Sequence, residues 1–340
     1  EIKNHQIRLG MGYSYGEIYK VTYRSNYGIN PNTGQPILPT TELTDISNTS
    51  AAFIPTGDRK NRHIFAQDIW TLNEKWEMTS GVRYDSYSDF GSTINPRLAL
   101  VWKATPDFVT KFLYGKAFRA PSFQELYQTN NPVALGNIDL KPEKIQTWEI
   151  ALDYRPSKKW HVSANVFTYN LTNKILFMPD ESAENYSAQN AGSQKGYGFV
   201  LEGGWQLGEK LVLTGSYAFQ TAKDQLEHEI ANVPNQDIYL RADWKLMSDW
   251  HLNTQASWIL GRKRAINDPR SAIDDYVNVD LSLHYEPSSS PWNITFSVRN
   301  LLDRDIREPA PGPDESGMIK IPYDLPMAGI NYFIGFDYHF

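Results

Sequence analysis

The last eleven residues, INYFIGFDYHF at positions 330–340, alternate large apolar side chains with smaller or polar ones. One face carries Ile330, Tyr332, Ile334, Phe336, Tyr338 and Phe340, and the other carries Asn331, Gly335, Asp337 and His339, with Phe333 as the exception. A period of two residues is the pattern of a β-strand whose two faces meet different surroundings. This segment therefore predicts a strand with one apolar and one polar face.

The same alternation recurs along the chain and predicts about 14 strands. The expected strands are 6–24, 61–72, 74–86, 95–104, 107–119, 145–155, 159–170, 196–206, 210–222, 236–246, 250–261, 275–286, 291–300 and 329–340. Most have about the 9–11 residues that a tilted strand needs to cross a bilayer. Asp68 interrupts the apolar face of the strand at 61–72.

The connections between these strands alternate in length. The short ones are 73, 105–106, 156–158, 207–209, 247–249 and 286–290, and the longer ones are 25–60, 87–94, 120–144, 171–195, 223–235, 262–274 and 301–328. Short periplasmic turns alternating with long external loops are typical of antiparallel outer-membrane β-barrels. The ten Trp residues all fall on the apolar faces, most of them beside short turns. This placement is expected of an aromatic girdle at a membrane interface.

The composition narrows the class of protein. The chain contains no Cys, which excludes disulfides and thiolate metal sites. Its net charge of −6 is spread along the chain, so no nucleic-acid partner is expected. The mean hydropathy is negative, as a barrel averages apolar outer and polar inner residues. The chain has no run of about 18 apolar residues, so no transmembrane helix is predicted. Glu1 begins in mid-sequence, so we expect a signal peptide or other sequence upstream.

Three motifs carry a family resemblance. Residues 114–127 are YGKAFRAPSFQELY, residues 137–143 are NIDLKPE and residues 298–303 are VRNLLD. They resemble signatures of TonB-dependent outer-membrane receptors. The matching positions are Phe118, Arg119, Ala120, Pro121, Glu125, Leu126, Asn137, Leu140, Pro142, Glu143, Asn300, Leu301 and Asp303. The final strand, with Tyr338 and Phe340, resembles the signal that the barrel-assembly machinery recognises.

The resemblance implies an all-β fold, with residues 1–340 as the C-terminal part of a 22-stranded barrel domain whose plug is absent. A closed barrel of about 14 strands is also physically possible. The implied function is active import of a scarce nutrient, most specifically a ferric siderophore, across the outer membrane of a Gram-negative bacterium. The TonB complex would energise import through the missing plug. The resemblance also implies a monomer that is surrounded by outer-membrane lipid and lipopolysaccharide. No cofactor is expected.

The motifs also have a physical interpretation. Pro121 and Pro142 lack an N–H group, so each marks the end of a strand. Arg119 ends an ascending strand, and Glu125, Glu143 and Glu149 are its candidate partners. We expect a salt-bridge network at the rim of the barrel rather than direct contact with a ligand.

The long loops supply candidate ligand contacts. Arginines there would suit an anionic ferric chelate. The candidates are Tyr27, Tyr127, Asn130, Asn131, Tyr186, Arg262, Arg264 and Tyr323. Residues 120–140 contain no His, which counts against haem, although haem and vitamin B12 stay open as substrates. No catalytic or metal-binding motif is found. A barrel enzyme of the lipase or protease type and a passive diffusion channel are the alternative functions.

Overall fold

The computed structural model describes residues 3–28, 30, 33, 35–37, 42–47, 49, 51–131, 133–179, 186–288, 290–313 and 317–338. Phe340, proposed as part of the assembly signal, lies outside the described residues, and Tyr338 is the last residue of the last strand. In the part of the chain that is described, no helix has the length or the apolar character needed to cross a membrane.

The described residues are dominated by antiparallel strands. The long strands are β1 (His5–Ile18), β4 (Gly57–Asn73), β5 (Trp76–Tyr87), β6 (Gly91–Thr105), β7 (Phe108–Arg119), β9 (Glu143–Ser157), β10 (Trp160–Pro179), β11 (Tyr186–Leu207), β12 (Leu211–Asp224), β13 (Gln236–Lys245), β14 (Trp250–Leu260), β15 (Tyr276–Tyr285), β16 (Trp292–Arg299) and β19 (Asn331–Tyr338). The short elements are β2 (Arg24–Ser25), β3 (Thr44–Asp45), β8 (Ala134–Leu135), β17 (Arg307–Glu308), β18 (Leu325–Pro326) and the helix α1 (Phe123–Tyr127).

The long strands are hydrogen-bonded in chain order from β1 to β19, within a 15-stranded sheet that also includes β8 beside β11. Since β1 and β19 stand at the two ends of this order, the sheet is not closed. The prediction of an all-β, antiparallel partial barrel is therefore confirmed.

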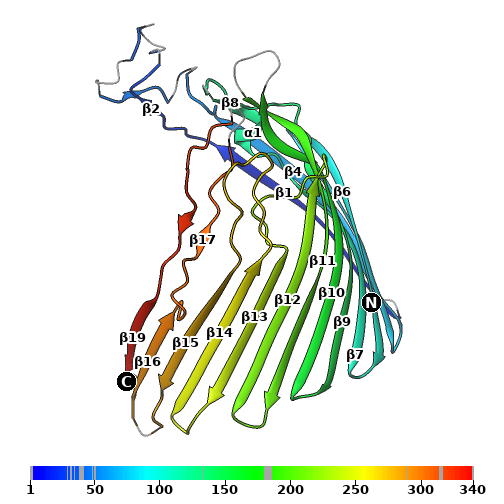
Figure 1. Cartoon of the computed structure of the whole chain (residues 1–340). Coiled ribbons are helices and arrows are strands. Elements are labelled where there is room, and N and C mark those ends of the chain that lie inside the picture. The colour runs from blue at the N-terminus through cyan, green and yellow to red at the C-terminus, as the bar shows by residue number, and fades with distance from the viewer. Residues whose placement is uncertain are drawn as a thin grey trace. The chain divides into compact units, whose positions relative to one another are not determined.

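Contacts divide the chain into two compact units. The first comprises Glu1–Leu100, Leu113–Trp148 and Tyr169–Gln194, and the second comprises Val101–Phe112, Glu149–Thr168 and Lys195–Phe340. Within the second unit, the short connections β11–β12, β13–β14 and β15–β16 lie at one end of the strands, and the longer connections β12–β13, β14–β15 and β16–β19 lie at the other (Figure 1). Sorting of connections by length, predicted from the sequence, holds in this unit.

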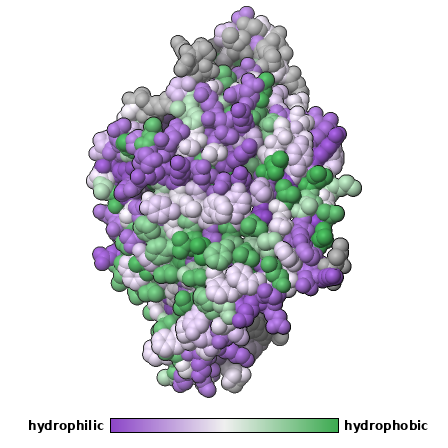
Figure 2. Space-filling model, turned by 90° about the vertical axis from the view of Figure 1, so that its right-hand side faces the viewer, coloured by the Kyte–Doolittle hydropathy of each residue, from purple (hydrophilic) through white to green (hydrophobic). Residues whose placement is uncertain are grey.

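The register keeps apolar side chains on one face. In the second unit Leu211 stands opposite Trp244, and Gly215 stands opposite Leu240. Trp244 and Leu240 stay largely exposed, as expected of side chains that face lipid rather than a protein core. Figure 2 shows hydrophobic side chains gathered across the middle of one side of the molecule, with hydrophilic side chains above and below them.

The opposite face carries charges that pair along single strands. Arg83 donates to Asp85 at 2.8 Å, and Arg241 donates to Asp243 at 2.8 Å. Residues i and i+2 share a face of a strand, so one strand can supply both partners of an ion pair. Asp68, the irregular residue on the apolar face, is paired as well, because its Oδ2 lies 2.7 Å from His5 Nδ1 on β1.

Several boundaries differ from the sequence-based prediction. β1 ends at Ile18 instead of residue 24, because its partner β4 begins opposite it at Gly57, just after Pro55, which cannot donate a ladder hydrogen bond. The predicted loop 171–195 is mostly strand, since β10 runs on to Pro179 and β11 starts at Tyr186. The predicted loop 87–94 shrinks to 88–90.

Candidate functional site

The rim motif of the first unit is built around Arg119, the last residue of β7. Its guanidinium donates two hydrogen bonds to Glu125, both at 3.0 Å, and two to Glu143, both at 2.8 Å. Bidentate pairs of this kind are the strongest that Arg makes with carboxylates. The expected rim network is present with these two partners, whereas Glu149 accepts a hydrogen bond from Asn165.

The helix α1 fixes Glu125 in place. Ser122 caps the helix, and the Glu125 carboxylate bonds back to the Ser122 N–H at 2.7 Å, which completes a capping box. Burial alone would raise the pKa of Glu125, but the Arg119 guanidinium and the Ser122 N–H hold it below its ordinary value. Glu125 therefore serves both as helix cap and as ion-pair partner, which ties the helix to the end of β7.

The apolar motif residues form a small core under this loop. Leu126 and Leu140 are almost fully buried and pack with Ile175 and Ala188. Gly136 passes so close that a Cβ there would lie 2.6 Å from the Gln128 nitrogen. In the described structure these motif residues therefore pack under the loop and hold its conformation.

A cation outside the predicted site residues, Arg59, also holds this loop. Arg59 donates to Asp89 at 2.6 Å and to the Pro121 carbonyl at 2.7 Å, and its guanidinium lies 4.8 Å from the centre of the Phe123 ring. Arg59 lies in the segment 25–60, which the sequence predicts to be a loop, and a loop prediction assigns no face to its side chain. Recognising that β4 begins at Gly57 would have placed Arg59 on the same face as other inward charges.

The VRNLLD motif of the second unit ties together the two ends of the last loop. Asn300, with a positive φ of 49°, donates from its side chain to the carbonyls of Arg304 at 2.9 Å and Ala328 at 3.3 Å. Its own N–H donates to Asp280 at 3.0 Å. Asp303 accepts from the Ile330 N–H at 3.1 Å. Asn tolerates the left-handed region better than most residues. Asn300 can therefore adopt the positive φ and also donate the side-chain hydrogen bonds that this position requires.

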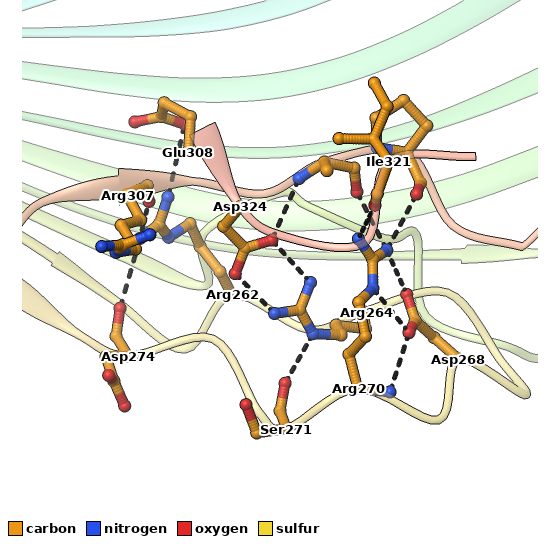
Figure 3. Close-up of polar contacts among 12 residues, drawn as sticks. Arg262, Arg264, Asp268, Arg270, Ser271, Asp274, Arg307, Glu308, Ile321 and Asp324 are labelled. Atoms are coloured by element: carbon orange, nitrogen blue, oxygen red, sulfur yellow. Dashed lines mark hydrogen bonds and ion pairs between the residues drawn. The ribbon is translucent and has the colours of Figure 1, made fainter. Parts of the chain in front are cut away.

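Three arginines join the β14–β15 loop to the β16–β19 loop, also within the second unit (Figure 3). Arg264 donates to both oxygens of Asp324, at 2.9 and 2.6 Å. Arg270 donates to Asp268 and to the Ile321 carbonyl. The hydrogen bonds from Arg264 lower the pKa of Asp324 to about 2, so this carboxylate stays charged throughout the physiological range.

Arg262 completes this connection from a buried position. Its guanidinium donates to the Arg307 carbonyl at 3.3 Å and to Glu308 at 3.3 Å, and it lies 5.0 Å from the centre of the Tyr276 ring. Arg262 and Arg264, proposed from the sequence as contacts for an anionic ligand, are thus brought together, but their charges face carboxylates of the protein. Tyr323, next to Asp324, is 77% exposed.

The other candidate contacts belong to the first unit. Tyr27 shares a hydrogen bond of 2.8 Å with the Tyr23 hydroxyl. Tyr127 packs against the small core of Leu126 and its neighbours. The Asn130 amide donates to the Ala52 carbonyl at 3.2 Å, and the Asn131 side chain accepts from the Val133 N–H at 2.9 Å. Tyr186 begins β11, where it pairs with Ala134. Most of these side chains shape loops, and their contact with a ligand stays a prediction.

A polar cavity of about 860 Å³ opens on the inner face of the second unit. Its wall is formed by alternate residues of β12 to β16 and β19, among them Asp237, Tyr239 and Tyr276. Arg299 also lines it, with its guanidinium 5.0 Å from the centre of the Phe333 ring. Within the described residues Arg299 forms no ion pair. Arg299 follows the alternating apolar residues Ile294, Phe296 and Val298, so the pattern of β16 predicts that it faces inward. Its position beside a cavity depends on strands far apart in sequence.

A metal centre made of protein side chains finds no support in the described ranges, where no group of three or more His, Asp or Glu residues is placed to hold an ion. The chemistry that this arrangement offers is recognition: phenol rings, a cation on an aromatic ring, and carboxylates around a hollow large enough for a small molecule.

An antiparallel sheet with an apolar outer face and a charged inner face, and in the second unit with its long loops at one end of the strands, is the arrangement of outer-membrane β-barrels. The family model "TonB dependent receptor-like, beta-barrel" matches residues 2–301. The chain belongs to this family of TonB-dependent receptors, whose barrels are outer-membrane proteins.

Comparison with individual proteins gives the same family. The chain is 26% identical over 273 residues to the heme/hemopexin utilization protein C of Haemophilus influenzae, covering 68% of this chain and 38% of the relative. It is also 26% identical over 273 residues to the metal-pseudopaline receptor CntO of Pseudomonas aeruginosa, covering 71% and 37%. The chain therefore spans well under half the length of these curated relatives. The metal-pseudopaline relative is a receptor, and TonB-dependent receptors as a family are not enzymes.

A solved structure shares the fold. A mutant of the ferric enterobactin receptor PfeA from Pseudomonas aeruginosa superposes with a TM-score of 0.71 at 16% identity, covering 98% of this chain and 50% of that one.

Proposed function

We propose that residues 1–340 form one barrel domain of an outer-membrane importer that takes up a ferric siderophore and is energised by the TonB complex. The protein performs no covalent chemistry in this scheme. The ligand meets exposed loop residues such as Tyr27 and Tyr323 first, and then the inner wall of the barrel. Membership of the receptor family supports import, and the names of relatives, which include a metal-pseudopaline receptor, favour a metal chelate.

The observation that carries the siderophore assignment is Arg299 above Phe333. A guanidinium that lies on a ring and has no carboxylate partner in the described residues keeps its charge available for a ligand. Ferric siderophore complexes are commonly anionic and have flat aromatic or amide surfaces, which suit a cation and the phenols of Tyr239 and Tyr276. Several kilocalories of binding free energy are expected from such charge-assisted contacts inside a partly enclosed hollow, at about 1.5–3 kcal/mol for each.

Growth and binding assays test this proposal together. A Gram-negative strain lacking its own siderophore receptors is given the gene and grown with single iron sources: defined ferric siderophores, haemin or ferric citrate. We expect growth on at least one ferric siderophore, and we expect deletion of TonB to abolish it. Growth that survives deletion of TonB would instead indicate a passive channel. Growth on haemin alone would refute the siderophore assignment.

A pair of matched variants links the result to the cavity. Arg299→Gln should weaken binding of the ferric siderophore to the purified protein about 10-fold or more, since a charge-assisted hydrogen bond of about 1.5 kcal/mol or more is lost. Arg241→Gln is the control, because Arg241 lies on the same face but is already neutralised by Asp243. Equal affinities for the two variants would show that the cavity cation plays no part.

A further inference from the structure

The outer face of the second unit contains a hollow of about 520 Å³ near the short-turn end of the strands. Four adjacent strands, β10 to β13, contribute its apolar wall. The outward-facing residues of that wall are Trp160, Val162, Gly203, Trp205, Leu213, Gly215 and Leu240. These belong to the apolar rows of β10 to β13, so the hollow opens toward the membrane and not toward the inside of the barrel.

Two glycines lie in this depression, and the space beside them differs. A Cβ on Gly215 would come within 2.8 Å of Leu240 Cδ2, so the Leu240 side chain leans into the space that the glycine leaves. Gly203 lies at a looser point, where a Cβ would meet its nearest atom at 3.4 Å. Trp160 and Trp205 stand on either side of this point and keep more than a third of their surface exposed. An indole ring prefers the level of the lipid headgroups, so the hollow starts at that level.

Three lysines lie in the two short turns next to the strand ends that line the hollow. Lys158 and Lys159 immediately precede Trp160, and Lys210 precedes Leu211 at the start of β12. The two turns are neighbours, because the Gln206 N–H at the end of β11 donates to the Lys159 carbonyl. All three lysines are exposed, and within the described residues none forms an ion pair. Glu209 is the acidic residue in the same pair of turns, which leaves an excess of positive charge.

We propose that this hollow is a binding site for an anionic glycerophospholipid of the membrane leaflet at the short-turn end. One acyl chain lies against Gly203 between the two tryptophans, and the phosphate is bound by Lys158, Lys159 and Lys210. Basic residues next to an apolar surface attract anionic lipids in this way. The site depends on the chain being a membrane barrel, which the family establishes, and does not depend on the substrate proposed above.

Native mass spectrometry of the purified chain, released from detergent, tests the site. Phosphatidylglycerol and phosphatidylcholine with identical acyl chains are added at equal concentrations, and the bound lipid is measured. We expect phosphatidylglycerol to be retained preferentially. Each Lys→Gln substitution at Lys158, Lys159 or Lys210 should reduce that preference about fivefold, from the typical contribution of one lysine near an anionic surface. Lys75→Gln, in the short turn between β4 and β5, is the matched control.

A second variant tests the apolar half of the site. Gly203→Leu fills the hollow without a backbone clash and should lower retention of phosphatidylglycerol at least as much as one lysine substitution, although all lysines remain. Circular dichroism checks that the sheet content is unchanged. Equal retention of the two lipids by the unaltered chain, or full retention of phosphatidylglycerol by Gly203→Leu, would overturn the proposal. An effect of Lys75→Gln as large as that of Lys159→Gln would do the same, since it would indicate general charge attraction.

Discussion

Replacing Arg119 by Met is expected to loosen the loop at 120–142 while leaving the sheet folded. Arg119 makes four hydrogen bonds of 2.8–3.0 Å to two carboxylates. Without it, Glu125 keeps its bond from the Ser122 N–H, and Glu143 keeps its bond from the Ile175 N–H at 2.8 Å. Two like charges would then face each other with one backbone partner each, which disfavours the closed loop.

The magnitude follows from the burial of the three groups. Breaking a buried ion pair by removing one partner costs about 3–5 kcal/mol, whereas an exposed pair contributes about 0.2–1 kcal/mol. The Arg119 side chain is 46% exposed, but the Glu125 and Glu143 side chains are only 15% and 13% exposed. We therefore expect an intermediate cost of about 2 kcal/mol, which corresponds to a roughly 30-fold larger population of the open loop.

Hydrogen exchange followed by mass spectrometry measures this opening directly. Amides of residues 123–128 and 134–140 should exchange about 30-fold faster in Arg119→Met, while those of β12 to β15 keep their rates. Arg155→Met is the control, since Arg155 is more exposed and pairs with Asp153 outside the loop. Unchanged exchange in the loop, or the same change in both variants, would refute the argument that Arg119 holds the loop closed.

Acidification should reproduce part of the effect in the unaltered protein. The pKa of Glu125 is lowered from 4.5 in the folded chain, so its stabilising contribution is present above that value and is lost as the pH falls through the lowered pKa. Loop exchange should therefore accelerate below about pH 4.5 relative to the base-line pH dependence of amide exchange. Arg119→Met should show a weaker acceleration, because its carboxylates no longer have the lowered pKa that Arg119 provides.

Three further changes test other contacts. Asp324→Asn should favour the open β16–β19 loop about 10-fold or more, because its charge-assisted bonds with Arg264 contribute about 1.5–3 kcal/mol. In the unaltered protein this contact should persist until the pH falls toward 2, the lowered pKa of Asp324. Hydrogen exchange of residues 317–326 measures both effects. Asn300→Ala should lower stability by about 2 kcal/mol, since it removes buried hydrogen bonds and places Ala at a positive φ; Asn300→Gly, which keeps the backbone conformation, should cost less in urea unfolding. Gly136→Ala should disrupt the loop by about 1–3 kcal/mol because the new methyl group meets backbone atoms that cannot move aside, and susceptibility to limited proteolysis between residues 120 and 142 reports this; a cleavage pattern identical to that of the unaltered chain would contradict it.

The strands could be predicted from the sequence because their signal is local. Alternation is dictated by the two faces of a single strand, so residues 330–338 or 276–285 reveal themselves without knowledge of their neighbours. Asp68 could not be explained in that way, since its partner His5 lies 63 positions away and becomes adjacent only through the register of β1 and β4. The extension of β10 and β11 past the predicted limits depends likewise on contacts with the loop they support, including the Ile175 N–H bond to Glu143.

The loop contacts were harder to predict for the same physical reason. The motif spacing correctly suggested that Glu125 and Glu143 bind Arg119, because all three lie near one strand end. Arg264 and Asp324 are 60 positions apart in two different loops, and no periodicity links them. A loop arginine looks available for a ligand in the sequence, whereas its carboxylate partner is visible only in three dimensions. Arg299 illustrates the converse, because alternation along β16 predicts that it faces inward, whereas its lack of a carboxylate partner among the described residues is visible only in the structure.

The hydrogen bonds of Asn300 and Asp303 have a consequence for which changes in loop length and sequence this protein can accept. They fasten the outgoing and returning ends of the last loop to each other and to Asp280, so the two ends of this loop are held together independently of the contacts that its described residues make with the β14–β15 loop. Insertions or deletions in the segment between residues 305 and 327 need not shift the register of β16 with β19, because the hydrogen bonds of Asn300 and Asp303 lie between that segment and the two strands. The segment is therefore a natural cassette, in which foreign peptides could be displayed or new ligand specificities selected without rebuilding the wall of the barrel.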